Sequence, residues 1–175
     1  QSKGIYILID ETYMDFVLSD NTVIHLVEKY PNLIVLRSLS QYYSVPGIRV
    51  GYGAACQGLI ELIKGNQYPW SVNVFASAVC ENIYEDVKYN TQTKKWLSTE
   101  PNRFYELIRS VNNVHVIKPS ANYIFVRLEE MLASVLCNRM LEKGFLIRNA
   151  SNFDFLDDHY IRIGVKDKRT NDKFF

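Results

Sequence analysis

Residues 38–52 read SLSQYYSVPGIRVGY and contain the strongest chemical signal in the sequence. Two hydroxyl side chains, Ser38 and Ser40, precede the guanidinium of Arg49 in this stretch. Hydroxyl groups can donate hydrogen bonds to phosphate oxygens, and an arginine can bind a phosphate through two parallel N–H groups. A serine-rich loop before a Gly-Ile-Arg turn is also a common surface turn when it stands alone. The whole stretch is more specific than that, and it predicts an anion-binding loop.

The sequence before this loop predicts two adjacent buried strands. Residues 5–9 (IYILI) form an apolar run that ends in an acid pair, and residues 32–37 (NLIVLR) form a second one. Between them, residues 21–30 have apolar side chains at helical spacing, so the order strand, helix, strand favours parallel pairing. Ligands bind beyond the carboxyl ends of parallel strands, where residues 10–13 and 38–41 both lie. Because a buried strand needs neighbours on both sides, we expect strands from outside this chain to complete the sheet.

The remaining pattern predicts an α/β fold, with a mostly parallel sheet followed by a small α+β domain. A third apolar segment at residues 50–56 precedes a helix at about 58–64 and a long helical stretch from Asn73 to Trp96. We expect the boundary near the end of that stretch, which gives part of a large domain at 1–97 and a small domain at 98–175. The elements expected in the small domain are a helix from Pro101, strands at 114–118 and 123–128, a helix at 130–143 that stops at Gly144, strands at 145–148 and 160–165, and a helix from Asn171.

The serine loop resembles the cofactor loop of the fold-type-I aminotransferase superfamily, whose enzymes use pyridoxal 5′-phosphate (PLP). In that family an S-x-S-K motif is followed, eight residues after the lysine, by the arginine of a G-[IL]-R-x-G-[YF] turn. Here the corresponding positions are Ser38, Ser40, position 41 and Arg49. The resemblance implies that the two serines and the arginine bind the cofactor phosphate. It also implies the large and small domains of that superfamily.

A second motif, Asp10-Glu11-Thr12-Tyr13, resembles the D-E-A-Y motif of the same family. By this resemblance, Asp10 pairs with the pyridine nitrogen of PLP and keeps it protonated, so that the ring can accept electrons from the substrate. Tyr13 is implied to donate a hydrogen bond to the phenolic oxygen of the ring. The alternative is structural, with an acidic cap for the next helix and Tyr13 packed in the core.

Two arginines in predicted strands of the small domain, Arg148 and Arg162, are candidates for binding the substrate. An unpaired cation in a strand is costly, so each needs a negatively charged partner. In the family, the arginine of an R-I-x-V-type strand binds the α-carboxylate of the substrate, and the resemblance assigns this role to Arg162 and, less directly, to Arg148. The alternative is a structural salt bridge with Asp154, Asp157 or Asp158.

Three segments narrow the resemblance to one branch of the superfamily. Residues 69–73 (PWSVN), 146–153 (LIRNASNF) and 160–163 (YIRI) are similar to L-threonine-O-3-phosphate decarboxylases of cobalamin biosynthesis. This implies PLP-dependent decarboxylation of a phosphorylated amino acid, L-threonine O-3-phosphate, to aminopropanol phosphate by a longer, homodimeric protein. Histidinol-phosphate aminotransferases share the cofactor loop but match less well around residues 151–153, so a PLP-dependent aminotransferase is the alternative enzyme.

Position 41 departs from the family pattern, because it is Gln41 where the family has the cofactor-binding lysine. A carboxamide can neither form a Schiff base nor act as an acid or base near neutral pH. Loss of proton transfer alone typically lowers turnover by about 10²–10⁴-fold. An introduced substitution, a sequence discrepancy and a natural loss of catalysis all explain the glutamine. The last of these makes a non-catalytic PLP-fold binding module the alternative from a different functional class.

Composition excludes several other classes of function. Twenty basic and nineteen acidic residues give a formal net charge of +1, which argues against binding nucleic acid through a basic face. Cys56, Cys80 and Cys137 form no CxxC pattern, and the histidines show no ligand spacing, so no metal site is expected. No apolar run approaches the roughly 18 residues that span a bilayer, and no signal peptide begins the sequence, so we expect a cytoplasmic protein without a membrane segment.

Overall fold

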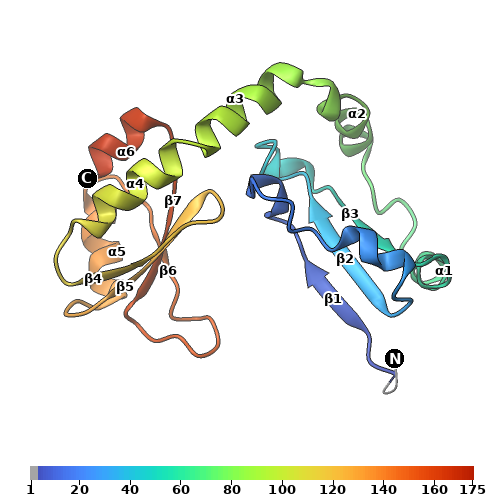
Figure 1. Cartoon of the computed structure of the whole chain (residues 1–175), viewed down its shortest axis with the longest axis horizontal. Coiled ribbons are helices and arrows are strands. Elements are labelled where there is room, and N and C mark those ends of the chain that lie inside the picture. Colours follow the sequence, from blue (N-terminus) through green and yellow to red (C-terminus); the bar gives the residue numbers. More distant parts are fainter. Residues whose placement is uncertain (1–3) are drawn as a thin grey trace. The chain divides into compact units, whose positions relative to one another are not determined.

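The computed structural model describes residues 4–175, and the chain divides after Asn90 into two compact units (Figure 1). The first unit contains a three-stranded sheet, and the second contains a four-stranded sheet. Helix α3 (Val87–Leu97) contributes residues to both units. The α/β class predicted from the sequence is confirmed.

The first unit has a mixed sheet in the order β1-β2-β3. Strands β1 (Ile7–Asp10) and β2 (Leu33–Ser38) are parallel, as the sequence predicted, and Asp10 is the register partner of Leu36. Strand β3 (Gly51–Ala55) pairs with β2 in the antiparallel direction, with Ser38 opposite Gly51. The loop between them contains only the short 3-10 helix η3 (Pro46–Ile48), which is too short for a parallel crossover, so the chain turns back.

A close backbone approach explains the glycine that begins β3. A Cβ atom placed on Gly51 would lie 2.6 Å from the carbonyl oxygen of Arg37 in β2. Real Cβ atoms do not come so close to a backbone oxygen, so any side chain here would force the two strands apart. Gly51 therefore permits β3 to pair with β2, and this pairing brings the end of the serine loop next to the end of β2.

The helix predicted at residues 21–30 is instead a 3-10 helix, η2 (Ile24–Glu28), of five residues. Tertiary hydrogen bonds hold the residues before it, because the carboxylate of Glu11 accepts from the hydroxyl of Thr22 at 2.7 Å and from the backbone of Val23 at 2.7 Å. These bonds keep Thr22 and Val23 out of a regular helix. Pro31 then prevents extension at the other end.

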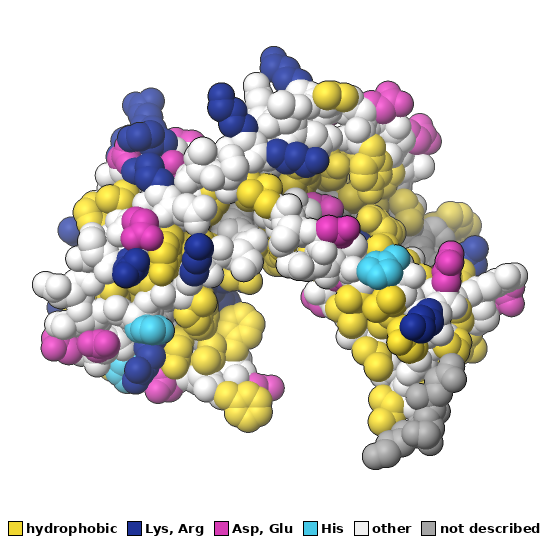
Figure 2. Space-filling view, viewed as in Figure 1, with side chains coloured by type: hydrophobic (Ala, Val, Ile, Leu, Met, Phe, Trp, Pro, Cys, Tyr) yellow, Lys and Arg dark blue, Asp and Glu magenta, His cyan; other side chains and the backbone are white. Residues whose placement is uncertain are grey.

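Strand β1 is exposed, so the prediction that it is buried is wrong for this chain. Ile7 and Leu8 are 49% and 59% exposed, and the preceding Ile5 and Tyr6 are 60% and 64% exposed. Among the described residues β1 pairs only with β2, which makes it an edge strand. Figure 2 shows hydrophobic side chains at the surface in this part of the first unit. The apolar sequence of β1 is typical of a strand with neighbours on both sides.

The long helix predicted from Asn73 to Trp96 is divided into α2 (Val74–Asn82), the 3-10 turn η4 (Ile83–Glu85) and α3. The break occurs at Asp86, whose backbone has φ −75° and ψ 75°. Its carboxylate accepts a hydrogen bond from the backbone of Tyr89 at 2.8 Å, which is the geometry of a helix cap. The predicted continuous helix is therefore interrupted at Asp86, which caps the start of α3. The other helices of this unit are η1 (Met14–Phe16) and α1 (Gln57–Gly65), and α1 agrees with the predicted segment.

The second unit is an antiparallel sheet in the order β4-β5-β7-β6, packed against helices. Its strands are β4 (Val114–Ile117), β5 (Tyr123–Leu128), β6 (Arg148–Asn149) and β7 (Tyr160–Gly164), and its helices are α4 (Glu100–Arg109), α5 (Ala133–Glu142) and α6 (Lys168–Phe174). Alternate residues of β5 and β7, including Ile124, Val126 and Ile161, are buried with Phe104 of α4. Gly144 has φ +83° and ends the α5 turn, as predicted. Helix α6 begins before the predicted Asn171, because Asp167 caps it.

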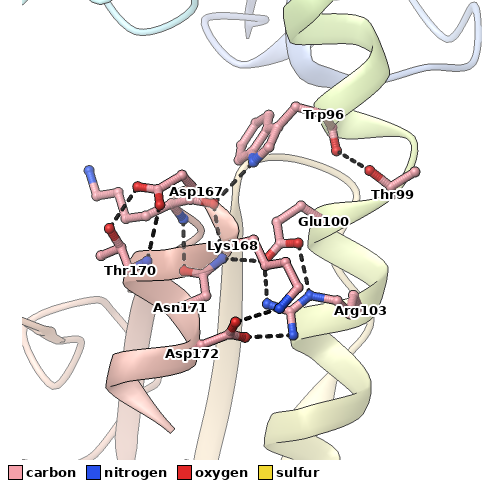
Figure 3. A network of polar contacts seen from close by, with 10 residues as sticks. Trp96, Thr99, Glu100, Arg103, Asp167, Lys168, Thr170, Asn171 and Asp172 are labelled. Atoms are coloured by element: carbon pink, nitrogen blue, oxygen red, sulfur yellow. Dashed lines mark hydrogen bonds and ion pairs between the residues drawn. The ribbon is translucent and has the colours of Figure 1, made fainter.

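A network of polar side chains joins α4 to α6 within the second unit (Figure 3). The amide of Asn171 donates to the carboxylate of Glu100 at 2.8 Å, and both residues are buried. Arg103 binds the same carboxylate at 2.6 and 2.9 Å and reaches Asp172 at 2.9 Å. Asn171 also donates to the carbonyl of Lys166 at 2.9 Å, which accepts the indole N–H of Trp96 at 3.0 Å. This α4–α6 network makes the last helix part of the core.

Replacement of Asn171 by alanine should lower the free energy of unfolding of this unit. The buried carboxylate of Glu100 and the carbonyl of Lys166 would each lose a donor, which costs about 1–3 kcal/mol. Urea unfolding can be followed by the fluorescence of Trp96 in a Trp70→Phe background. The control is Asn138→Ala on the exposed face of α5, which should change stability by no more than about 0.5 kcal/mol. Equal effects of the two variants would contradict a structural role for the network.

The same network should make the unit less stable in acid. Hydrogen bonds from Arg103 lower the pKa of Glu100 below its ordinary value of 4.5, and a hydrogen bond from Lys168 lowers the pKa of Asp172 below 3.8. The folded state therefore binds fewer protons than the unfolded state in this range. The stabilisation is complete above the ordinary pKa values and is lost as the pH falls through the lowered ones. Unfolding measured between about pH 6 and about pH 3 should lose less stability in Glu100→Gln than in the unmodified chain.

Candidate active site

The ends of β1 and β2 lie side by side and carry the predicted acid and the first predicted serine. The backbone N–H of Glu11 donates to the carbonyl of Leu36 at 2.9 Å, which continues the parallel pairing past Asp10. Ser38 follows two residues after Leu36 on the neighbouring strand. The side chain of Asp10 is exposed, and its Oδ1 accepts from the backbone of Thr12 at 2.9 Å. This bond turns the chain sharply at the strand end, and it leaves the second carboxylate oxygen available for a ligand.

Tyr13 lies in the turn that follows Asp10. Its side chain is partly buried, and its ring centroid is 6.0 Å from that of Phe16. This contact belongs to an aromatic cluster in which Phe16 also packs edge-on against Tyr42, at 5.3 Å, in the serine loop. Tyr13 therefore does pack against other side chains, as the structural alternative predicted. The role of its hydroxyl group toward the cofactor stays a prediction.

The two serines of the loop have different surroundings. The hydroxyl oxygen of Ser38 accepts from the backbone N–H of Ser40 at 3.1 Å, so its own hydrogen remains available to a ligand. Ser40 is buried, and its hydroxyl donates to the carbonyl of Val50 at a long 3.4 Å. The backbone of Leu39 reaches the same carbonyl, also at 3.4 Å. Ser40 thus closes the loop on itself, and Ser38 is the freer phosphate donor of the two.

Arg49 stands where the loop returns to the sheet, two residues before Gly51. Its backbone adopts a left-handed conformation, with φ 57° and ψ 61°, which costs about 1–3 kcal/mol in a residue other than glycine. The guanidinium is exposed, and its Nη1 donates to the carbonyl of Pro46 at 2.9 Å. That bond uses one of the five N–H groups of a guanidinium. The pairing of β3 with β2 therefore brings Arg49 to the sheet edge that also carries Ser38 and Asp10.

Gln41 is exposed, although it lies between the buried residues Ser40 and Tyr42. Its backbone carbonyl accepts from the N–H of Ser44 at 3.3 Å, so the loop turns immediately after it. The amide side chain therefore faces outward from the loop and takes no part in the packing. Because the position is exposed, a lysine would fit here without displacing buried neighbours, whereas the glutamine presents no nucleophile.

A buried ion pair beneath the site was missed from the sequence. Arg37, the residue before Ser38, donates from Nε to the carboxylate of Glu11, the residue after Asp10, at 2.9 Å. The two side chains are 10% and 2% exposed. Arg37 also binds Asp15 at 3.0 Å and the hydroxyl of Thr22 at 2.8 Å. The available signal was a charged residue at the end of each of the two predicted strands.

The two carboxylates around Arg37 have opposite pKa shifts. Burial raises the pKa of Glu11, but hydrogen bonds from Val23 and Thr22 and the charge of Arg37 outweigh it, so the pKa lies below its ordinary value. Burial dominates at Asp15 and raises its pKa, although Arg37 opposes the shift. Glu11 is therefore the firmly ionised partner of Arg37.

The groups at this sheet edge fit part of a PLP molecule. A carboxylate on one strand end suits the protonated ring nitrogen, and a hydroxyl and a guanidinium on the next suit the phosphate. Gln41 does not fit the covalent attachment that the family makes at this position. The residues therefore match non-covalent binding of the cofactor, and their individual roles remain predictions.

The two arginines of the second unit stand directly opposite each other. Arg148 in β6 is the register partner of Arg162 in β7. Arg148 donates to the amide oxygen of Asn152 at 2.8 Å, with its guanidinium 5.8 Å from the centre of the Phe153 ring, and Arg162 lies 5.2 Å from the ring of Tyr123. Like charges in such a pair repel each other. This arrangement becomes favourable when an anion binds between the two side chains.

The structure gives no support to salt bridges as the alternative role of these arginines. Among residues 4–175, no ion pair joins Arg148 or Arg162 to a carboxylate. Asp157 pairs with His159 at 3.2 Å instead. The carboxylate of Asp158 accepts hydrogen bonds from Ser134 and Asn149, which lower its pKa.

In the part of the chain that the structure describes, no group of three or more histidine, cysteine or acidic side chains is placed to hold a metal ion. Within the same residues, no helix has both the length and the apolar character required to cross a membrane.

Replacement of Arg37 by methionine should strongly destabilise the first unit. The change leaves the buried carboxylate of Glu11 without its cation, and breaking a buried ion pair in this way typically costs about 3–5 kcal/mol. The control is Arg109→Met, which removes an ion pair to Glu106 whose side chains are both 63% exposed, and it should cost at most about 1 kcal/mol. Urea unfolding of the two variants tests the difference, and a small loss for Arg37→Met would show that the pair is not a main support of the sheet.

Comparison with known proteins places this chain in a family. The threonine-phosphate decarboxylase of Salmonella typhimurium is 30% identical over 99% of this chain, which covers 48% of that protein. The crystal structure of the histidinol-phosphate aminotransferase from Clostridium acetobutylicum matches with a TM-score of 0.91 and 31% identity, covering 97% of this chain and 52% of that one. That of L-threonine-O-3-phosphate decarboxylase from Porphyromonas gingivalis matches with a TM-score of 0.86 and 27% identity, covering 95% and 52%. The chain thus spans about half the length of the relatives that it matches.

The family model described as aminotransferase class I and II matches residues 1–175, the whole sequence. This match confirms the superfamily predicted from the serine loop, whose members are enzymes, and with it PLP as the family's cofactor. The chain therefore belongs to the aminotransferase class I and II family.

Proposed function

We propose that the protein of which this sequence is part catalyses PLP-dependent decarboxylation of L-threonine O-3-phosphate to aminopropanol phosphate, a step of cobalamin biosynthesis. The observation that carries the proposal is the pair Arg148 and Arg162, which face each other without a carboxylate partner among the described residues. A phosphorylated amino acid has two anionic groups and suits a site with two guanidinium groups. The relatives named threonine-phosphate decarboxylase, at 31% and 30% identity, support the same substrate class.

In this proposal the first unit binds the cofactor at its sheet edge. Ser38 and Arg49 hold the phosphate, and Ser40 shapes the loop that carries them. The carboxylate of Asp10 holds the proton on the ring nitrogen, and the hydroxyl of Tyr13 donates to the phenolic oxygen. When bound, PLP supplies an electron sink for the bond that breaks at the substrate α-carbon.

The second unit is proposed to bind the substrate. Arg162 binds the α-carboxylate of the substrate before decarboxylation. Arg148 binds a second anionic oxygen of the substrate. Asn152 and the ring of Phe153 restrict the side chain of Arg148, so less rotamer entropy is lost when the anion binds.

Restoring lysine at position 41 tests this function. The complete protein with Gln41→Lys, supplied with PLP and L-threonine O-3-phosphate, should release carbon dioxide at least about 10²-fold faster than the protein with glutamine, because the amine can transfer protons and the amide cannot. The control is Gln57→Lys, which adds the same charge at an exposed position of α1 and should leave the rate unchanged. The rate is measured from the carbon dioxide released.

Two other outcomes of that experiment identify the alternatives. Turnover that requires an oxo-acid acceptor, without release of carbon dioxide, would identify an aminotransferase of the histidinol-phosphate type, which the TM-score of 0.91 to such a structure supports. PLP binding without any turnover in the Gln41→Lys protein would instead indicate a non-catalytic binding module.

We also infer a homodimer in a reducing, cytoplasmic compartment. Support for the dimer comes from exposed apolar side chains around the start of α2, since large exposed apolar patches mark interfaces. Trp70 is 94% exposed, Val74 74% and Phe75 72%. Support for the compartment comes from Cys56, Cys80 and Cys137, which are all free thiols. Sedimentation of the complete protein measures the oligomeric state directly.

A further inference from the structure

We infer that Asn73 is a positioning residue for the phosphate-binding arginine, Arg49. This inference rests on the proposed function, in which Arg49 holds the phosphate of PLP. Asn73 does not reach a ligand itself in this proposal. It acts by fixing the backbone from which the guanidinium extends.

The side-chain amide of Asn73 joins two elements of the first unit. Its Nδ2 donates to the carbonyl oxygen of Ile48, the residue before Arg49, at 3.0 Å. Its Oδ1 accepts from the backbone N–H of Ala76 at 2.9 Å, which caps the N-terminus of α2. The two bonds use the two ends of the amide, so each determines the orientation required by the other. The amide therefore ties the loop of Arg49 to a helix.

The bond to Ile48 acts on the part of the loop where the backbone is strained. The carbonyl of Ile48 and the N–H of Arg49 belong to one planar peptide unit, so holding the carbonyl fixes the direction of the whole plane. Arg49 then enters its left-handed conformation, with φ 57°. A residue with a side chain leaves this region unless its surroundings hold it there. Asn73 holds one side of the residue, and the bond from Nη1 to the carbonyl of Pro46 holds the other.

The left-handed backbone determines where the guanidinium lies. Immediately after Arg49 the chain enters β3, where Gly51 pairs with Ser38. If the peptide plane turned, Arg49 could relax to an ordinary conformation, and its side chain would leave the edge that carries Ser38. Loss of the Asn73 bond should therefore weaken phosphate binding, and the binding of the ring should be unaffected.

The variant Asn73→Ser separates this role from helix capping. A serine hydroxyl still caps α2, since serine is among the preferred N-cap residues, but its shorter side chain cannot reach the carbonyl of Ile48. The probes are pyridoxine 5′-phosphate and pyridoxine, which share the ring, differ in the phosphate and carry no aldehyde that would react with lysines. Their dissociation constants are measured by titration calorimetry on the complete protein. We expect Asn73→Ser to weaken the phosphorylated probe about fivefold to tenfold and to leave pyridoxine unchanged.

Two further variants make the result specific. Asn82→Ser removes a similar amide-to-carbonyl bond, to Ala78 at 2.9 Å, from the far end of the same helix, and it should change neither affinity. In an Arg49→Ala background, Asn73→Ser should have no further effect on the phosphorylated probe, because the side chain that it positions is gone.

The outcomes distinguish this inference from the proposed function. If the unmodified protein binds pyridoxine 5′-phosphate and Asn73→Ser binds it equally well, the positioning role is wrong and the proposed function stands. Equal weakening of both probes would also overturn it, because that result indicates a general loss of structure. If the unmodified protein binds neither probe, the proposed function fails, and this inference fails with it.

Discussion

The buried ion pair between Glu11 and Arg37 is the interaction on which the first unit, with its proposed cofactor site, depends. Each partner is the immediate neighbour of a predicted site residue, since Glu11 follows Asp10 and Arg37 precedes Ser38. A short, desolvated salt bridge tolerates little displacement, and breaking it leaves a buried charge without compensation. The pair therefore reinforces the backbone bond between Glu11 and Leu36 that holds the two strand ends together. These strand ends carry the carboxylate proposed for the ring nitrogen and the hydroxyl proposed for the phosphate.

The arginine pair proposed to bind the substrate depends on a different constraint, the alternation of side chains along antiparallel strands. In β7, Ile161 and Ile163 face the core, so Arg162 between them must face the opposite side of the sheet. The register of β6 then places Arg148 beside it. The two guanidinium groups repel each other. Their neighbours among the described residues are the rings of Phe153 and Tyr123 and the amide of Asn152, and none is a carboxylate. Charge concentrated in this way favours an anionic ligand with two charged groups.

Gln41 illustrates how fold and chemistry can separate at a single position. Its side chain is exposed, and the loop is closed by the hydroxyl of Ser40 and by the backbone N–H groups of Tyr43 and Val45, so packing does not select the residue at this place. Replacement of a lysine therefore costs the fold little. Ser38 and Ser40, which are proposed to serve the cofactor, also make hydrogen bonds within the loop itself, so the loop keeps its shape whichever residue stands at position 41.

The sequence by itself determined the family, the strand ends that carry Asp10 and Ser38, the limits of β5 and the helix stop at Gly144. These features depend on local residue chemistry, namely apolar runs, spacing within a short motif and the left-handed freedom of glycine. Only the tertiary structure decided the antiparallel return of β3, the exposure of β1, the break at Asp86 and the pairing of Arg148 with Arg162. It alone also revealed the Glu11–Arg37 pair and the two bonds of Asn73. Each of these depends on contacts between residues far apart in the chain, and such contacts leave no periodic signal in a single sequence.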